Sequence, residues 1–269
     1  MSLRDLQEDA RARARNPVPG AASFAKFMNV LQVIADSPGT LDMAQITRRT
    51  RFPRGTVYRL VAALVAEGLV SQSGENGTFR LGPRLLQLAA KTWEDSDLRT
   101  IARDFLASLR DATDEAVHLA VPSNNRMVYI DKLVGSSTVQ MKTSIGGQVE
   151  FHSTSVGKAW LSGLTDDRLE EIIKGLELTR HTANTLTSPE ALREELKRIR
   201  EQGFAFDDEE NEPDIRCLGS PIFNRQREPV GAISVSMPVY RHDARRHELR
   251  ARLVRETAIR ITAELSRIP

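Results

Sequence analysis

The sequence predicts an α+β protein of two domains, and three observations support this prediction. At 269 residues the chain is longer than most single domains. Its apolar residues follow helical spacing in some segments and strand spacing in others. Lys and Arg outnumber Asp and Glu by 14 to 10 in residues 1–99, but they total 24 against 26 in residues 100–269. A basic front and a mildly acidic back indicate two different tasks.

Composition excludes several classes of protein. The chain is 40% hydrophobic and 28% charged, as is usual for globular proteins in water. No apolar run approaches the ~18 residues of a membrane span, and the N-terminus lacks the core of a signal peptide. Cys217 is the only cysteine, which rules out an intrachain disulfide and suits a reducing compartment. We therefore expect a cytoplasmic protein with no membrane partner.

Residues 1–22 are expected to form a flexible tail. The segment carries few bulky apolar residues and contains a Pro- and Gly-rich end. Three of its arginines could contact a phosphate backbone: Arg11, Arg13 and Arg15. A solvated tail is the simpler interpretation of the same pattern.

Residues 23–84 are predicted to be one domain, which opens with two helices. Five apolar residues share a face of the first helix: Phe24, Phe27, Met28, Leu31 and Ile34. The segment SPGT at 37–40 ends that helix. Asp42 starts the second helix, because Gln45 three residues later completes a capping box. Three residues of the second helix are expected to face inward: Met43, Ala44 and Ile46.

A third helix and a hairpin complete this domain. Pro53 suits the first turn of a helix, and Gly68 suits the position just beyond its end. The expected buried face consists of Val57, Leu60, Val61 and Leu64. The strand-like segments LVSQ and TFRLG flank Asn76-Gly77, which is a hairpin turn signal. Two helices, a turn, a third helix and a hairpin, in that order, predict a winged helix-turn-helix.

The charge around the third helix indicates a polyanionic partner, namely double-stranded DNA. Residues 42–60 hold five arginines against one acid. The outward face and start of the third helix are expected to meet base edges through Arg54, Gly55, Thr56, Tyr58 and Arg59. Flanking arginines are expected to contact phosphates: Arg48, Arg49, Arg51 and Arg80 on the wing. A basic helical unit that contacts another protein is the alternative.

The rest of the chain is predicted to hold a linker helix at 85–99 and a second domain at 100–269. Trp93 on the linker helix needs cover from the second domain or from a second subunit. Six segments of the second domain have strand character: 116–121, 126–133, 137–143, 204–207, 215–223 and 230–238. Helices are predicted near 156–163, 166–174 and 189–202, and a final amphipathic helix closes the chain with Leu249, Leu253, Ile261 and Leu265.

An enzyme is the competing class of function. Cys217 and His152 could act as nucleophile and base, but the sequence shows no orienting third residue and no nucleophile elbow. A metal site that combines His118, His242 or His247 with Cys217 is disfavoured, because no pair has zinc-type spacing apart from a lone HDARRH segment. The sequence also lacks a P-loop and a dinucleotide-binding fingerprint. We expect no catalytic residue, no metal and no cofactor. An architectural DNA binder without an effector is a third class, which a separate domain of this size disfavours.

Several segments together resemble the IclR family of bacterial transcription regulators over nearly the whole chain. They are RGTVYRLVAALVAEGLV with FRLG, FHSTSVGKAWLS, REQGFAFDDEENEPDIRCLGSPIF and AISVSMP. The resemblance implies a winged helix-turn-helix, a linker helix and a GAF/PAS-like domain that binds a small effector, in a dimer or tetramer. It favours a repressor over an activator. VYIDK, FHSTSVGKA and EENEPDIRC look most like regulators of pectin and sugar-acid breakdown, whose effector is 2-keto-3-deoxygluconate.

The same resemblance implies six effector contacts: Ser155, Val156, Asp207, Cys217, Ser234 and Ser236. The amino end of a helix favours a carboxylate, a carboxyl group can bind hydroxyls, and serines two apart on a strand face the same side. From the residues alone, satisfied interior serines and a solvated Asp207 are the simpler interpretations. The chain departs from the family pattern at Gly55, where serine is usual, and at Pro213 in the pocket loop.

Overall fold

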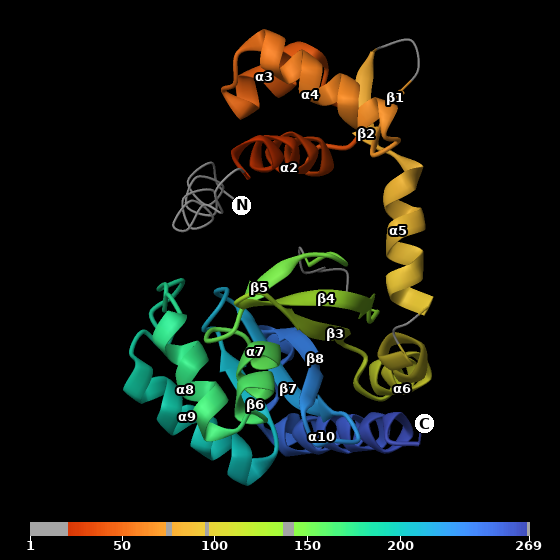
Figure 1. The fold of residues 1–269 in the computed structure, drawn as a ribbon. Coiled ribbons are helices and arrows are strands. Elements are labelled where there is room, and N and C mark those ends of the chain that lie inside the picture. Colours follow the sequence, from red (N-terminus) through yellow and green to blue (C-terminus); the bar gives the residue numbers. More distant parts are fainter. Residues whose placement is uncertain (1–20, 74–76, 95–96, 137–142, 268–269) are drawn as a thin grey trace. The chain divides into compact units, whose positions relative to one another are not determined.

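The computed structural model describes residues 21–73, 77–94, 97–136 and 143–267 (Figure 1). The chain divides into two compact units with the boundary between Asp95 and Ser96. The predicted tail therefore lies almost wholly outside the described residues, together with its three arginines. Each unit has its own core, and each is described by itself below.

The first unit has the element order of a winged helix-turn-helix, as predicted. Its elements are α2 (Ala22–Ala35), α3 (Met43–Thr50), α4 (Arg54–Ala66), β1 (Val70–Ser73), β2 (Thr78–Leu81) and α5 (Pro83–Glu94). The strands β1 and β2 pair in antiparallel fashion. The side chain of Trp93, on α5, lies outside the described residues.

Local interactions start and stop these helices as their sequences predict. The carboxylate of Asp42 accepts from the amide of Gln45 at 2.7 Å, and the amide of Asp42 donates to the Gln45 side chain at 2.8 Å. This capping box satisfies two amide groups at the start of α3. Gly68 follows α4 with φ of 69°, a conformation that glycine adopts without strain.

The core of the first unit confirms most of the predicted apolar faces. Four α4 residues are buried as expected: Val57, Leu60, Val61 and Leu64. The prediction for α2 was partly wrong, because Phe24 is 66% exposed and Met28 is 43% exposed. Ile34 is buried as predicted, but the buried face is centred between it and Val30, about a quarter turn from the predicted centre. Ala44 is also exposed, since α3 buries Ile46 and Thr50.

The second unit is a mixed α+β domain built on one six-stranded sheet. Its elements are α6 (Asp97–Thr113), β3 (Ala116–Ser123), β4 (Arg126–Leu133), β5 (Gln148–Glu150), α7 (Ser155–Ser162), α8 (Asp166–Gly175), α9 (Pro189–Gln202), β6 (Ala205–Asp208), β7 (Ile215–Phe223), β8 (Pro229–Pro238) and α10 (Ala244–Leu265). A 3-10 turn at Val239–Arg241 precedes α10. The strand predicted at 137–143 falls on residues of which only Thr143 is described, and β5 was not predicted.

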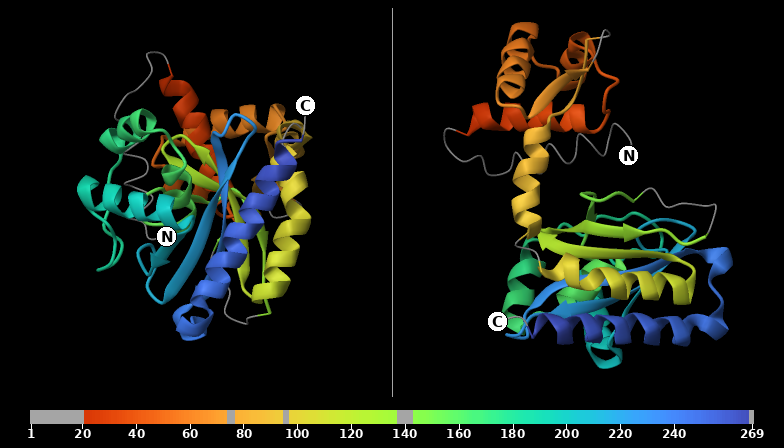
Figure 2. Two further views of the ribbon diagram at one scale, coloured as in Figure 1. Left: turned by 90° about the horizontal axis from the view of Figure 1, so that it is seen from below. Right: turned by 90° about the vertical axis from the view of Figure 1, so that its right-hand side faces the viewer.

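The sheet is antiparallel and has the strand order β5-β4-β3-β8-β7-β6. On one face α6 and α10 lie side by side, and they pack over residues such as Leu119, Leu218 and Val235 (Figure 2). On the other face α7 packs against β7 and β8, with α9 beside it. Alternate residues of each strand therefore face two separate cores. The second of these faces carries the buried polar residues that were predicted to contact an effector.

Candidate functional site

The outward face of α4 carries two arginines and an exposed glycine. Arg54, Gly55 and Arg59 are exposed, Tyr58 is 63% exposed, and Thr56 is half-buried at the first turn. A methyl group built on Gly55 would meet no atom within 4 Å, so the surface around this glycine is open. This face leaves room for close approach by a large partner.

Four more arginines of the same unit are exposed, on or next to α3 and on β2: Arg48, Arg49, Arg51 and Arg80. Arg49 donates to the hydroxyl of Ser37 at 2.6 Å, and Arg59 donates to the carbonyl of Gly55 at 3.3 Å. A guanidinium carries five N–H donors, so these contacts leave donors free for a ligand. The combined surface is strongly cationic over α3, α4 and β2.

In the second unit, strand register brings four of the six predicted effector contacts together. Cys217 on β7 lies opposite Asp207 on β6 and opposite Ser236 on β8. Ser234, two residues before Ser236, therefore faces the same side of the sheet. All four are less than a tenth exposed, and this is the sheet face that α7 covers. The interpretation of Asp207 as a solvated turn residue was wrong, since it is 3% exposed.

The other two predicted contacts, Ser155 and Val156, open α7 against this cluster. The hydroxyl of Thr154 caps the helix by accepting from the amide of Gly157 at 3.1 Å. A methyl group on Gly219 would lie 2.8 Å from the backbone of Ser155. Glycine at 219 therefore lets the amino end of α7 approach the strand that pairs with Ser234.

A fully buried cation, Lys158 of α7, ties this cluster together. Its ammonium donates to the carbonyl of Phe206 at 2.6 Å and to Glu210 Oε1 at 2.5 Å, with Glu195 Oε1 at 3.4 Å. The amide of Glu210 in turn donates to the carboxyl group of Asp207 at 2.8 Å. Helix α7 is thereby attached to β6 and to the turn that follows it.

The surroundings of Asp207 raise its pKa close to neutral pH, so both protonation states are populated there. Burial and the nearby charge of Glu210 raise the pKa of Asp207 to about 7, although Lys158 opposes the shift. Burial also raises the pKa of Glu210, whose Oε2 atom has no hydrogen-bond partner within the described part of the chain. At neutral pH a protonated Asp207 can donate a hydrogen bond, and an ionised one can only accept.

Two further side chains of this cluster, His118 and Tyr129, were not among the predicted effector contacts. His118 is fully buried and lies opposite Ser234, with its ring centroid 4.8 Å from that of Tyr129. Its Nδ1 atom is 3.5 Å from the Ser236 hydroxyl. Burial and the charge of Lys132 lower the pKa of His118 to about 3, so its ring is neutral. A histidine inside the apolar run AVHLAV was the available signal.

The structure gives no support to the nucleophile–base pair of Cys217 and His152. Burial, together with the charge of Asp207, raises the pKa of the Cys217 thiol, so the reactive thiolate is disfavoured. The ring of His152 contacts the carbonyl of Thr179 and the carboxylate of Glu150. His242 and His247 do meet, with Nε2 and Nδ1 3.0 Å apart.

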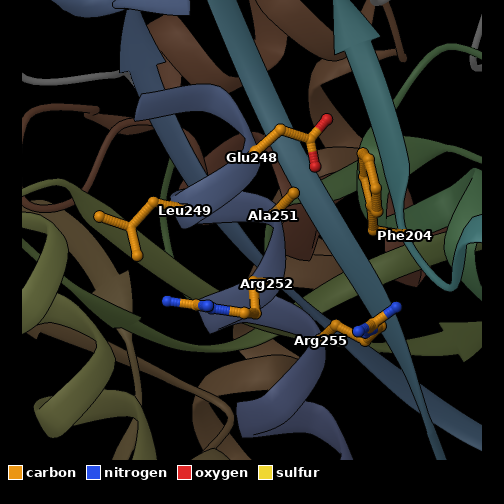
Figure 3. Close-up of a pocket in the computed structure, with 6 residues that line it drawn as sticks. All are labelled: Phe204, Glu248, Leu249, Ala251, Arg252 and Arg255. Carbon is orange, nitrogen blue, oxygen red and sulfur yellow. The ribbon is translucent and has the colours of Figure 1, made fainter. Parts of the chain in front are cut away.

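A separate groove of about 340 Å³ lies on the other side of the sheet (Figure 3). It is lined by Phe204, Glu248, Leu249, Ala251, Arg252 and Arg255. Most of these residues belong to α10, and none is a predicted effector contact. Leu249, which was predicted to face inward from α10, is 45% exposed, so the described residues do not fully cover it.

Comparison with known proteins identifies both units. Residues 23–74 match the sequence model described as the IclR helix-turn-helix domain. Residues 90–263 match the one described as the C-terminal part of bacterial transcriptional regulator IclR. The chain is 31% identical to the transcriptional repressor IclR of Escherichia coli, over 86% of this chain and 85% of that protein. It is 30% identical to the HTH-type transcriptional regulator KdgR of E. coli, over 91% and 92%.

Solved structures agree with these sequence matches. The IclR crystal structure from Thermotoga maritima superposes with a TM-score of 0.76 at 30% identity, over 90% of this chain and 98% of that one. An IclR homologue from Microbacterium hydrocarbonoxydans, complexed with 4-hydroxybenzoate, superposes with a TM-score of 0.78 at 25% identity, over 91% and 99%. Within the described residues, no helix is long and apolar enough to span a membrane.

The raised pKa of Asp207 predicts that stability falls as pH rises from 3.8 to about 7. The folded-state pKa lies above the unfolded value of 3.8, so the folded chain holds this proton more tightly. That stabilisation is fully present below the unfolded pKa and is lost as pH rises through the folded pKa. Asp207→Asn, which stays neutral, should flatten this dependence and be more stable than the wild type above neutral pH.

Urea unfolding of the wild type and Asp207→Asn across this pH range measures the difference. Glu212→Gln, which removes an exposed acid from the same loop, is the matched control and should keep the wild-type slope. Identical pH slopes in the wild type and Asp207→Asn would contradict the assigned protonation of Asp207.

Proposed function

Because the chain belongs to the IclR family of bacterial transcriptional regulators, we propose that it is a repressor whose affinity for operator DNA is controlled by a small organic acid. The buried polar cluster at the amino end of α7 is the observation that carries this proposal. The helix-turn-helix unit supplies DNA binding. Relatives are described as repressors, which supports that sign of control.

We propose that α4 enters the major groove as the recognition helix. Its exposed first turns carry Arg54, Gly55, Thr56, Tyr58 and Arg59. Arginine matches guanine O6 and N7 in this groove, and the open surface at Gly55 permits close approach. Phosphate contacts are assigned to Arg48, Arg49, Arg51 and Arg80, which are exposed in the same unit.

The effector is proposed to bind with its carboxylate at the amino end of α7. Amide groups at Ser155 and Val156 and the helix dipole favour an anion there. Hydroxyl or oxo groups of the acid would meet Asp207, Cys217, Ser234 and Ser236, which lie on the same sheet face. The related chain complexed with 4-hydroxybenzoate supports a small carboxylate as the ligand class. Within that class we favour 2-keto-3-deoxygluconate, on the sequence resemblance given above.

A dimer or a dimer of dimers is proposed as the DNA-binding form. One winged helix-turn-helix covers a small part of the duplex, and two-fold related half-sites one or more turns apart extend that contact. Light scattering of the protein alone and with a pseudo-palindromic DNA should show at least two copies per complex. A monomer under both conditions would contradict the proposed assembly.

Arg59→Ala is expected to weaken operator binding and to relax sequence choice. A bidentate contact from arginine to guanine is worth about 1–3 kcal/mol of discrimination against the wrong base. Arg80→Ala is the matched control, because the loss of a phosphate contact should weaken binding to specific and to random DNA equally. Fluorescence anisotropy with operator and random duplexes measures both losses. Equal losses of affinity for operator and random DNA in Arg59→Ala would show that Arg59 contacts a phosphate and not a base.

Asp207→Ala is expected to abolish effector binding while leaving ligand-free DNA binding unchanged. The two sites lie in separate compact units, so the substitution should not disturb α4. Calorimetry with 2-keto-3-deoxygluconate and a panel of other small oxo- and hydroxy-acids measures the first effect, and anisotropy measures the second. Unchanged acid affinity in the mutant would remove Asp207 from the site. If a different acid gives binding heat and 2-keto-3-deoxygluconate gives none, the proposed site is retained and the favoured effector is excluded.

A further inference from the structure

We propose that Glu150, His152 and His181 form a binding site for a divalent transition-metal ion such as Zn²⁺. The three residues offer a carboxylate oxygen and two ring nitrogens that all lie within 4.8 Å of one another. Two imidazoles and one carboxylate are a common ligand set for such ions, with an open position left for water.

The separations of the ligand atoms suit a metal at their centre. Glu150 Oε2 lies 3.4 Å from His152 Nδ1 and 2.8 Å from His181 Nε2. Two ligands of a tetrahedral ion with bonds of about 2.1 Å are about 3.4 Å apart. The first pair already has this spacing. The second pair needs a small outward movement of His181, whose side chain is 31% exposed.

The second ring nitrogen of His152 fixes its tautomer. His152 Nε2 lies 3.0 Å from the carbonyl of Thr179, which can only accept, so Nε2 carries the proton. In the neutral ring, Nδ1 then presents a lone pair to the carboxylate of Glu150, and neither atom can donate to the other. A metal-bound histidine is usually oriented in this way, with its other N–H on a backbone carbonyl. A cation between the two atoms resolves the unfavourable contact.

The carboxylate and the loop that carries His181 are also held in place. Arg126 Nη2 lies 3.5 Å from Glu150 Oε1, which leaves Oε2 for the histidines. The amide of His181 donates to the hydroxyl of Thr185 at 3.0 Å. Thr185 is buried and donates to the carbonyl of Glu210 at 2.6 Å. Glu150 ends β5, and His152 lies in the short turn between β5 and α7, so two of the three proposed ligands are held by the backbone before any metal binds.

The position of this site connects it to the neighbouring polar cluster. His152 is three residues before Ser155 at the start of α7. Ser153, between them, donates to the side chain of Asn211 at 3.0 Å, in the turn after β6. A bound ion would fasten the loop around His181 to the entry of α7. Metal binding should therefore stabilise the second unit as a whole.

Zinc titration of the metal-stripped full-length protein tests the proposal. We expect one Zn²⁺ bound per chain, with a rise in the unfolding temperature of the protein. Glu150→Gln keeps the shape of the side chain, and His181→Ala alters a partly exposed residue, so both variants should fold, which circular dichroism checks. Each should bind Zn²⁺ at least about 100-fold more weakly than the wild type. Co²⁺ absorption should report nitrogen and oxygen ligands in the wild type only.

His247→Ala is the matched control, because it removes a histidine from the separate His242–His247 pair. It should bind Zn²⁺ as the wild type does. Absence of stoichiometric binding in the wild type would overturn the proposal. Unchanged affinity in both Glu150→Gln and His181→Ala would also overturn it, and loss of binding in His247→Ala would place the ion at the other pair.

Discussion

The second unit depends on the interactions that the ammonium group of Lys158 makes inside it. It is fully buried, and a buried charge is tolerated only when it is paired and hydrogen-bonded. Its partners come from three places: the β6 carbonyl of Phe206, Glu210 in the following turn and Glu195 on α9. Those contacts join α7 to β6, to the turn after β6 and to α9. The amino end of the same helix lies against Gly219. Glu210, in the turn after β6, donates its amide to Asp207, and burial raises the pKa of the Asp207 carboxyl group.

Much of the fold could be predicted from the sequence, because local signals and long-range packing agree. The strands at Arg126–Leu133 and Ile215–Phe223 have the predicted limits, since polar turns bound apolar runs at both places. The face of α2 was only partly predicted. Apolar residues occupy adjacent rows of that helix, and the packing partner, which the local pattern does not contain, decides which row is buried. The three-residue strand β5 has no pattern of its own and is held by pairing with β4.

The candidate sites were predictable to different degrees. The exposed arginines of α4 follow directly from its buried stripe, because a helix has fixed angular spacing. Asp207 stands in an acidic run that resembles a solvated turn, and only its pairing with Cys217 carries it inside. His118 looks like a core residue until its neighbours are known. Glu150 and His181 are far apart in the chain, so no spacing in the sequence predicts that their side chains come into contact.

Coupling between the polar cluster and operator binding is tested most directly by calorimetric titration of the acid with and without saturating operator DNA. A ligand changes DNA affinity only through unequal affinity for two states of the protein, and the coupling is reciprocal. If the protein is an inducible repressor, as proposed, bound operator weakens acid binding by about 5–150-fold. The acid should weaken operator binding by the same factor. Equal acid affinity with and without operator would contradict control of DNA binding by the acid.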